Sequence, residues 1–459
     1  MSKVRIEQDS MGELEVPQDA LYGAQTQRAI NNFPVSGQTM PEAFIQALIL
    51  IKDMIAQVNV SLGEVQADTG QGISAACQTL LADPQLMRHF PVDVFQTGSG
   101  TSTNMNANEV IAKLASQLSG LSIHPNDHVN YGQSSNDVIP TCIHVSAALA
   151  LEQKLLPALQ HLLDTINSKA KTLESFCKTG RTHLMDAMPV RMDQSLLGWA
   201  AQIQQQISTL KSIQSAIQTL ALGGTAVGTG VNAPKHLAIK FSQVLSEHTG
   251  LQFTVGDNFF ALIASQDTAV TLSGMCKSLA VTLMKIANDL RWMNSGPLAG
   301  LSEISLKALQ PGSSIMPGKV NPVIPEAVAM AAAQVIGNDT AITLGGQSGN
   351  FELNVMLPMI AQNLLSSMSL LSHSATLLAD KAICDFTVNQ EQIAHALHRN
   401  PILVTALNPL IGYAKAAEIA KLAYQQKRPI IDVAEEHTDI SRQELEQLLD
   451  PMHLTKGVN

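Results

Sequence analysis

The sequence is poor in aromatic residues and in charge. Of its 459 residues, 4% are aromatic and 14% are charged, whereas 45% are hydrophobic. The core must therefore be built from Leu, Ile, Val, Ala and Met, which suits long packed helices better than a β-sandwich. The same hydrophobic content argues against a disordered chain.

Cysteine is scarce and shows no pairing pattern. Its five occurrences are odd in number, far apart and without a C-x-x-C pair: Cys77, Cys142, Cys177, Cys276 and Cys384. This spacing argues against a disulfide scaffold and against structural zinc. We expect each to be a small buried apolar side chain in a reducing compartment.

Signals of several other protein classes are also missing. Residues 1–7 lack the apolar core of a secretory signal, and no apolar run is expected to reach membrane-spanning length. The net charge of −10 argues against a nucleic-acid partner. No helical spacing such as H-E-x-x-H predicts a metal, and the glycine-rich residues 223–230 lack the strand that a dinucleotide site needs. We therefore expect a cytoplasmic protein with no metal, no nucleic acid and no membrane.

Apolar residues recur at helical spacing through the middle of the chain. Leucines and isoleucines return every three or four residues over 151–166 and 196–220. Further helices are predicted over 43–60, 266–293, 326–336 and 355–380. Helices of this length need neighbours to cover their apolar stripes, so an all-α bundle is predicted. Residues 327–333, AVAMAAA, have almost no polar face, which indicates burial in an oligomer core.

Three domains are predicted from helix length and from breaks. Residues 1–136 are rich in Pro and Gly and predict a mixed, mostly helical N-terminal domain. Residues 137–390 predict the central bundle of long helices. Residues 391–459, interrupted by Pro401, Pro409 and Pro429, predict a small C-terminal helical domain.

Polar segments interrupt the apolar helices, each at an expected helix boundary. They are residues 98–106 (GSGTSTNMN), 124–127 (HPND) with 133–137 (QSSND), and 180–187 (GRTHLMDA). Hydroxyls and small residues ahead of a helix offer O–H and N–H donors to an anion. Ordinary helix caps have the same composition, so each segment alone is weak evidence for an anion-binding site.

Residues 312–322, GSSIMPGKVNP, are the most informative stretch. They combine a possible proton acceptor, exposed backbone N–H groups and a fixed cation. A reaction that forms a carbanion beside a carboxylate needs these three groups. A surface connector is the alternative for a loop of Gly, Pro and Ser, but the order of residues is too specific for it.

Together these segments resemble the class II fumarases of the fumarase/aspartase superfamily. The resemblance runs from residues 9–13 (DSMGE) and 22–26 (YGAQT) to 405–409 (TALNP), and it includes 98–110 and 349–355 (GNFELNV). It implies an all-α homotetramer without cofactor, with one large central bundle and active sites shared between subunits. The implied activity is the reversible hydration of fumarate to L-malate, a step of the tricarboxylic acid cycle.

The resemblance also implies a role for each matching residue. Ser313 would take the C3 proton of malate, Lys319 and Asn321 would bind the carboxylate on which negative charge accumulates, and His183 with Glu326 would orient the water. Other binders of the dicarboxylate would be Ser99, Gly100, Thr101, Ser134, Ser135, Asn136 and Thr182. A second, non-catalytic dicarboxylate site would comprise His124, Pro125, Asn126 and Asp127.

Three alternatives remain open from the sequence. Aspartate ammonia-lyase shares the GSSIMP loop, and residues 322–326 resemble its version of the loop exit, whereas His183, Ser135 and His124 resemble fumarase. Tyr131 and Gly132 also depart from the form expected in fumarases. A non-catalytic, crystallin-like descendant would have lost Ser313, His183 or Lys319, and all three are present. A plain helical scaffold has no need for these polar loops.

Overall fold

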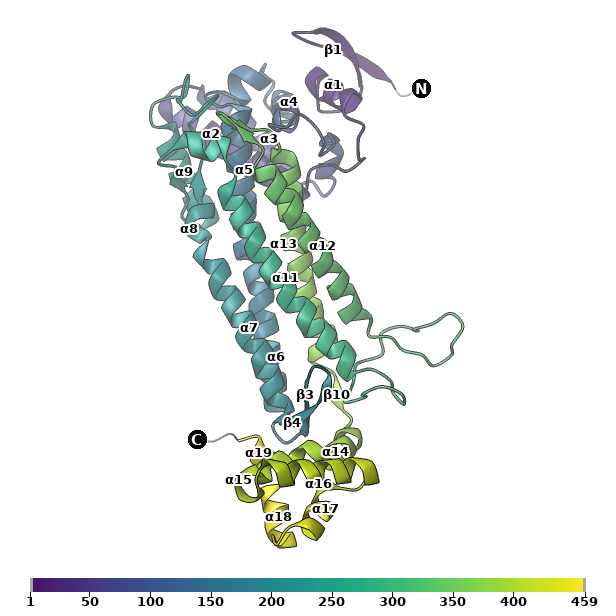
Figure 1. Cartoon of the computed structure of the whole chain (residues 1–459). Helices are drawn as coiled ribbons and strands as arrows, with labels where there is room; N and C mark the ends of the chain where they lie inside the picture. Colours follow the sequence, from purple (N-terminus) through teal and green to yellow (C-terminus); the bar gives the residue numbers. More distant parts are fainter. Residues whose placement is uncertain (1–2, 457–459) are drawn as a thin grey trace. The chain divides into compact units, whose positions relative to one another are not determined.

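The computed structural model describes residues 3–456 and confirms an all-α fold (Figure 1). Its few strands form small two-stranded sheets. The chain divides into two compact units of three segments each: Met1–Pro157, Ser208–Ala280 and Ala332–Ser372 in unit 1, and Ala158–Ile207, Val281–Ala331 and His373–Asn459 in unit 2. The three domains predicted above were defined by helix length along the sequence, a different criterion, and their boundaries stay a prediction.

Unit 1 is built from the N-terminal hairpin and a set of packed helices. Its elements are β1 (Val4–Asp9), β2 (Gly12–Pro17), α1 (Ala24–Asn32), α2 (Glu42–Leu62), α3 (Ala67–Leu81), η1 (Leu86–His89), α4 (Thr101–Ser119), η2 (Pro125–Val129), α5 (Ser135–Ala150), η3 (Leu151–Leu155), α8 (Gln214–Ile217), β5 (Thr219–Leu220), α9 (Leu237–Thr249), β6 (Thr254–Val255), α10 (Phe259–Ala264), β8 (Gly349–Asn350) and β9 (Leu353–Asn354).

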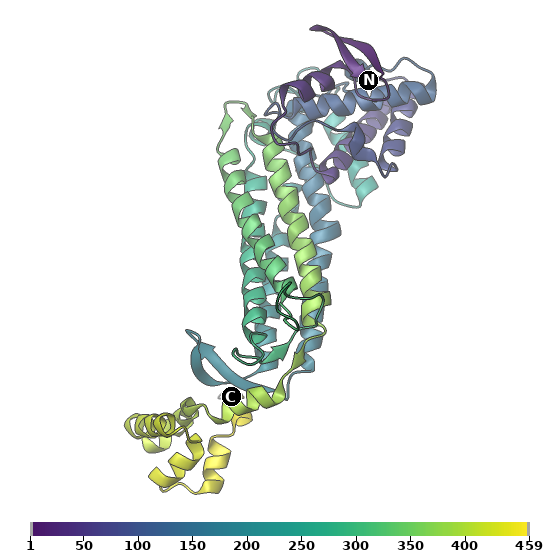
Figure 2. The same cartoon turned by 90° about the vertical axis from the view of Figure 1, so that its right-hand side faces the viewer.

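Unit 2 carries a second hairpin and the short C-terminal helices, which cluster together in Figure 2. Its elements are α6 (Leu156–Lys171), β3 (Cys177–Thr182), β4 (Met185–Arg191), β7 (Ile304–Ser305), η4 (Ala379–Ile383), β10 (Thr387–Val388), α14 (Gln390–His398), η5 (Pro401–Leu407), α15 (Asn408–Ile411), α16 (Tyr413–Gln426), α17 (Ile430–His437), α18 (Arg442–Leu448) and α19 (Pro451–Leu454). The first two residues of α6 belong to unit 1, and four further helices are divided between the units: α7 (Met192–Ser212), α11 (Asp267–Met293), α12 (Val323–Gly346) and α13 (Leu357–Leu378).

Helix α2 forms the centre of the unit 1 core. Phe44, Leu48, Ile51 and Ile55 are fully buried, because α2 packs against α3, α5 and α9. Burial on several sides explains why this helix reads as an almost continuous apolar run. The predicted helix over 43–60 is therefore confirmed, with one or two more residues at each end.

Helix α12 is longer than predicted. The prediction ended it at residue 336, before the poor helix formers Gly337, Asn338 and Asp339. In the structure Asp339 accepts hydrogen bonds from Ser273 Oγ at 2.8 Å and Lys277 Nζ at 2.6 Å, and Asn338 Nδ2 donates to Ser367 Oγ at 3.0 Å. Tertiary partners on α11 and α13 thus outweigh local propensity and carry the helix to Gly346.

The expectation about membrane-spanning length was wrong. Three helices are long and apolar enough to cross a membrane by length and composition: α2, α11 and α12. In α2 the most apolar window is 78% buried inside the chain, whereas in α12 only 33% is buried. The apolar surface of α2 is thus accounted for by the core, and that of α12 is not.

The expectation that all five cysteines are buried was also wrong. Cys77, Cys142 and Cys276 are buried, but Cys177 is half-buried and Cys384 is exposed. Cys384 follows η4, where its thiol donates to Asp380 O at 3.0 Å. Asp380 and Lys381, four and three residues before it, are charged and exposed, so Cys384 lies on the polar face of this turn.

Buried His144 predicts acid sensitivity of unit 1. Its Nδ1 donates to Thr219 O at 2.7 Å, and burial lowers its pKa from 6.5 to about 4. The stability contributed by the neutral ring is present above pH 6.5 and is lost as pH falls through about 4. We expect His144→Gln to remove up to ~3 kcal/mol of the acid-induced loss in unfolding free energy.

Urea denaturation at pH 7 and at pH 4.5 measures this difference, with His398→Gln, an exposed histidine, as the control. An equal acid-induced loss in wild type and His144→Gln would contradict the expectation.

Candidate active site

The loop of residues 312–322 surrounds the hydroxyl of Ser313 with backbone donors. The N–H groups of Ile315 and Met316 donate to Ser313 Oγ at 3.2 and 3.0 Å. Serine is a weak base in its neutral form, and donors aimed at its oxygen favour the deprotonated form. The structure thus places around Ser313 part of the stabilisation that a serine base needs.

Hydrogen bonds across the base of this loop hold its two ends together. Gly312 N donates to Lys319 O at 2.8 Å, and Asn321 Nδ2 donates to Gly312 O at 2.8 Å. A Cβ at Gly312 would lie 2.5 Å from Lys319 O, so the close approach requires glycine. Lys319 Nζ donates to Asn321 Oδ1 at 2.8 Å, which fixes the ammonium beside the loop. Ser313, Lys319 and Asn321 are therefore brought together.

Glu326 lies in the first turn of α12, next to the same loop. It lines a cavity of about 920 Å³ together with Lys319 and Asn321. Arg291 and Trp292, at the end of α11, line the same cavity. The wall of this cavity carries a cation and a carboxylate. Its volume is larger than a four-carbon acid requires, so further side chains could enter it beside the substrate.

His183 occupies the turn of a β-hairpin, whereas the prediction placed it at a helix boundary. Thr182 pairs with Met185, so His183 and Leu184 form a two-residue turn with φ of 55° and 60°. Both central residues of such a turn need positive φ, which normally favours Asn or Gly. A strained, exposed histidine at a hairpin tip is typical of a side chain retained for function.

A buried charge cluster holds this hairpin in place. Glu303 accepts from Arg181 Nη1 at 2.6 Å and lies 3.2 Å from Lys178 Nζ. Burial lowers the pKa of Lys178 from its usual value, against the raising effect of the Glu303 carboxylate. Asn400 Nδ2 adds a hydrogen bond of 2.8 Å to Ala187 O on β4. The cluster sets the position from which Thr182 and His183 project.

Ser99, Gly100 and Thr101 lie at the N-terminus of α4. Gln96 Oε1 caps the first turn by accepting from Thr103 N at 2.9 Å, and Ser99 Oγ and Thr101 Oγ1 are 2.8 Å apart. The other N–H groups of this first turn and the two hydroxyls offer donors to an anion. The backbone just before this helix packs closely against Val355. Only glycine fits at position 98, since a Cβ there would lie 1.8 Å from Val355 O.

Ser134, Ser135 and Asn136 start α5, where a capping box orders the backbone. Ser134 Oγ accepts from Asn136 N at 3.2 Å, and Asp137 Oδ1 accepts from Ser134 N at 2.9 Å. The glycine-rich residues 223–230 serve this loop, because Gly223 N and Thr225 N donate to Asp137 Oδ2. This contact explains the glycine-rich segment without a nucleotide.

The HPND segment forms a tight turn in the same unit. His124 Nδ1 accepts from Asn126 N and Asp127 N at 3.3 Å each, and Pro125 begins η2. The side chains of His124 and Asp127 are exposed. The turn presents polar groups to solvent, and its assignment as a second dicarboxylate site stays a prediction.

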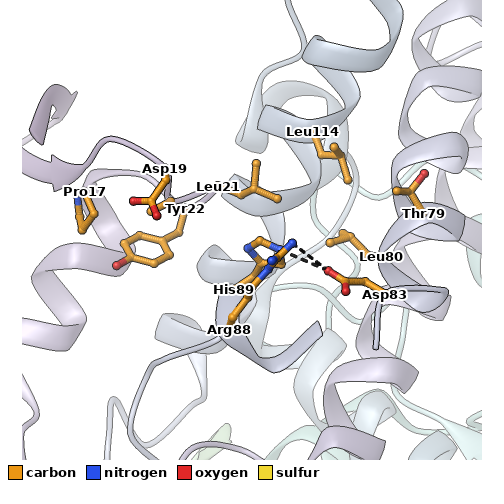
Figure 3. A pocket seen from close by; sticks show the side chains of 11 residues that line it. Pro17, Asp19, Leu21, Tyr22, Thr79, Leu80, Asp83, Arg88, His89 and Leu114 are labelled. Atoms are coloured by element: carbon orange, nitrogen blue, oxygen red, sulfur yellow. Dashed lines mark hydrogen bonds and ion pairs between the residues drawn. The ribbon is translucent and has the colours of Figure 1, made fainter. Parts of the chain in front are cut away.

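A separate cavity in unit 1 contains none of the predicted site residues. It measures about 530 Å³ and lies between the N-terminal segment and α3 (Figure 3). Arg88 Nη2 lies 3.2 Å from Asp83, and Arg88 Nε donates to His89 Nε2 at 3.0 Å. The Arg88 guanidinium is thus already paired with Asp83 and His89, so this cavity offers no unpaired arginine to a dicarboxylate.

The predicted residues thus fall into two groups. Unit 2 carries the loop of Ser313, the turn of His183 and Glu326; unit 1 carries the starts of α4 and α5 and the HPND turn. Within the described residues 3–456, no hydrogen bond or ion pair joins His183 to Glu326. Their pairing, and the role of each predicted residue, stay predictions.

Sequence reasoning missed the groups that support these loops. They are the backbone N–H groups of Ile315 and Met316, the Glu303 cluster, and a buried lysine, Lys52, behind the α5 loop. Only Lys52 leaves a readable signal, since it interrupts the apolar run ALILIKDMI of residues 47–55.

Comparison with known proteins places the chain among the lyases. A family model described as lyase matches residues 12–337, and one described as the fumarase C C-terminus matches residues 403–456. Fumarate hydratase class II 2 of Pseudomonas aeruginosa is 66% identical, over 100% of both chains. The chain belongs to the class II fumarate hydratase family.

Further relatives support this membership. Fumarate hydratase class II of Mycobacterium tuberculosis is 48% identical over 99% of this chain and 96% of the relative. The crystal structure of class II fumarase from Schistosoma mansoni has a TM-score of 0.96 at 38% identity and covers 100% of both chains. The resemblance inferred from the polar segments is confirmed over the whole chain.

Proposed function

We propose that the chain catalyses the reversible hydration of fumarate to L-malate, as a step of the tricarboxylic acid cycle in the cytoplasm. The observation that carries the proposal is the loop in which Ser313 Oγ accepts two backbone N–H groups beside Lys319 and Asn321. Full-length similarity to class II fumarate hydratases supports the same reaction.

In the malate-to-fumarate direction, Ser313 removes the C3 proton. That proton is very weakly acidic, because the electron pair it leaves behind must move into an adjacent carboxylate that is already negatively charged. Lys319 stabilises the resulting aci-carboxylate by charge, and Asn321 holds the ammonium in position through its Oδ1. The electron pair then returns to form the C2=C3 double bond as the C2–O bond breaks, and His183, paired with Glu326, donates the proton with which the departing hydroxide leaves as water.

The substrate carboxylates are bound by helix starts and hydroxyls. The start of α4 with Ser99 and Thr101, and the start of α5 with Ser134, Ser135 and Asn136, offer N–H and O–H donors. Lys319 and these donors provide the positive potential that the net charge of −10 does not.

An ultraviolet assay tests the proposal. Purified protein should consume fumarate and form L-malate without added metal, nucleotide or ammonia, and a chelator should leave the rate unchanged. Loss of activity with the chelator and recovery with a divalent cation would contradict the cofactor-free mechanism.

Active sites shared between subunits of a homotetramer are part of the proposal. Helix α12 exposes Met330 at 69% and Leu344 at 55%, and the hairpin tip exposes Leu184 and Met185. The most apolar window of α12 is only 33% buried, and an apolar surface left exposed in this way typically marks a protein interface. A partner chain on these surfaces would also bring a second set of site loops to each cavity.

Complementation between two inactive variants tests the shared site. Ser313→Ala and His183→Asn proteins should each be nearly inactive alone. Unfolding and refolding equal amounts together should restore about a quarter of wild-type sites, since each site then takes the two residues from different chains.

Refolded mixtures are first shown to contain mixed tetramers by native mass spectrometry of differently tagged chains. Mixed tetramers without activity would contradict the shared site, because a site built within one chain never contains both wild-type residues.

A further inference from the structure

Lys52 is a fully buried cation in an apolar helix. It lies on α2 with an exposure of 0%, among Ile51, Ile55 and other core residues. Its ammonium donates to Asn130 Oδ1 at 3.0 Å and to Gln133 Oε1 at 2.8 Å. A buried ammonium is strongly destabilising compared with an apolar side chain of similar volume. Core packing alone therefore gives no reason for a lysine here.

Asn130 connects this lysine to the start of α5. Its Oδ1 also accepts from Asn104 Nδ2 at 3.2 Å and Asn108 Nδ2 at 3.1 Å, both on α4. Asn104 Nδ2 in turn donates to Ser135 Oγ at 3.1 Å. A continuous path of side chains thus runs from the buried ammonium to a hydroxyl at the proposed substrate site.

A second set of bonds fixes the backbone before Ser134. Asn130 Nδ2 donates to Gln133 O at 3.3 Å, and Gln133 Nε2 donates to Val129 O at 3.0 Å. Lys52 donates to the side-chain oxygens of both Asn130 and Gln133, so it holds these two side chains in the positions that fix the backbone before Ser134. Removing it leaves the Gln133 oxygen without its donor.

Electrostatics give the lysine a second reason. Asp137, in the first turn of α5, is fully buried, and its negative charge opposes a dianion bound at that helix start. The Lys52 ammonium offsets this charge: burial lowers the pKa of Lys52 to about 7, and the Asp137 carboxylate acts in the opposite direction by raising it. Burial raises the pKa of Asp137 to about 6 and those of the nearby thiols of Cys77 and Cys142 well above their usual range.

We propose that Lys52 is a positioning residue of the dicarboxylate site, which fixes Ser134, Ser135 and Asn136 through Asn130 and Gln133 and offsets the charge of Asp137. This inference rests on the proposed function, because it takes the start of α5 as part of the substrate site. Lys52 itself does not touch substrate.

Replacement of Lys52 by methionine tests the proposal. Succinate, a four-carbon dicarboxylate that cannot be hydrated, reports on binding as a competitive inhibitor. We expect Lys52→Met to raise the inhibition constant of succinate and the KM of fumarate roughly 10- to 100-fold, with a smaller change in kcat. Ile55→Ala, which removes a neighbouring core side chain, should lower Tm and leave both constants within about twofold.

The pH dependence separates positioning by a charge from packing. Wild-type affinity for succinate should fall as pH rises from 6 through 8, because Lys52 loses its proton with a pKa of about 7. Lys52→Met should bind weakly at every pH and lack this part of the decline. An inhibition constant and pH profile equal to wild type would overturn the proposal.

Asn130→Ala keeps the test valid if Lys52→Met fails to fold. It should weaken succinate binding to a similar extent, and the double variant should be no worse than the weaker-binding single variant, since both act along one path. Additive effects would overturn the path through Asn130. Wild-type protein that fails to hydrate fumarate would instead count against the proposed function, whatever the variants do.

Discussion

Ser313→Ala is expected to lower kcat for fumarate hydration by about 10²- to 10⁴-fold, the usual contribution of a general acid or base. Ser313 Oγ makes hydrogen bonds only to N–H groups of its own loop among the described residues, so its loss leaves the core intact. Steady-state rates, followed by the ultraviolet absorbance of fumarate, measure the effect.

The adjacent serine is the matched control. Ser314 is exposed and lies in the same loop. Ser314→Ala should keep kcat within about threefold of wild type, since a surface hydroxyl carries little energy. Near-normal turnover by Ser313→Ala, or equal losses in both variants, would remove Ser313 from the mechanism.

His183→Asn is expected to lower kcat by a similar factor, about 10²- to 10⁴-fold, with substrate binding changed less. Asparagine suits the test because it tolerates the positive φ of 55° at this position, so the hairpin turn is retained. The measured quantities are kcat for fumarate and the inhibition constant of succinate.

Leu184→Asn is the control for the turn itself. Leu184 has a φ of 60° and faces the same conformational constraint, but it carries no proton-transfer group. It should retain kcat within a few-fold. A large rise in KM for His183→Asn at unchanged kcat would indicate that His183 binds a carboxylate and does not act on water.

The sequence predicted most of the long helices well because their apolar periodicity is local. The helix predicted over 196–220 is an exception, since α7 ends at Ser212 and is followed by α8 and β5. Helix α11 was predicted over 266–293 and spans Asp267–Met293, and α13 differs by about two residues at each end. The extension of α12 beyond residue 336 was missed because it depends on Asp339 and Asn338 finding partners on other helices. Tertiary contacts of that kind leave no periodic signal.

The candidate site was found from its segments, but its geometry was not. Residue order identified Ser313, Lys319 and Asn321, and these lie together in one loop. The hairpin at His183 was missed, since its turn uses two residues that rarely adopt positive φ. The Glu303 cluster was also missed, because it joins residues that lie 122 positions apart in the sequence.

Measuring fumarate formation from L-malate and from L-aspartate, with one enzyme preparation and one ultraviolet assay, is the most direct test of the proposed activity. Lyases of the two kinds share the GSSIMP loop, so both substrates offer Ser313 a similar proton, and the leaving group decides between them. His183, at the tip of its hairpin, is expected to act on water as the leaving group and not on ammonia. L-malate should give fumarate rapidly and L-aspartate should give none above background. Faster release of fumarate from L-aspartate than from L-malate would contradict the hydratase assignment and identify an ammonia-lyase.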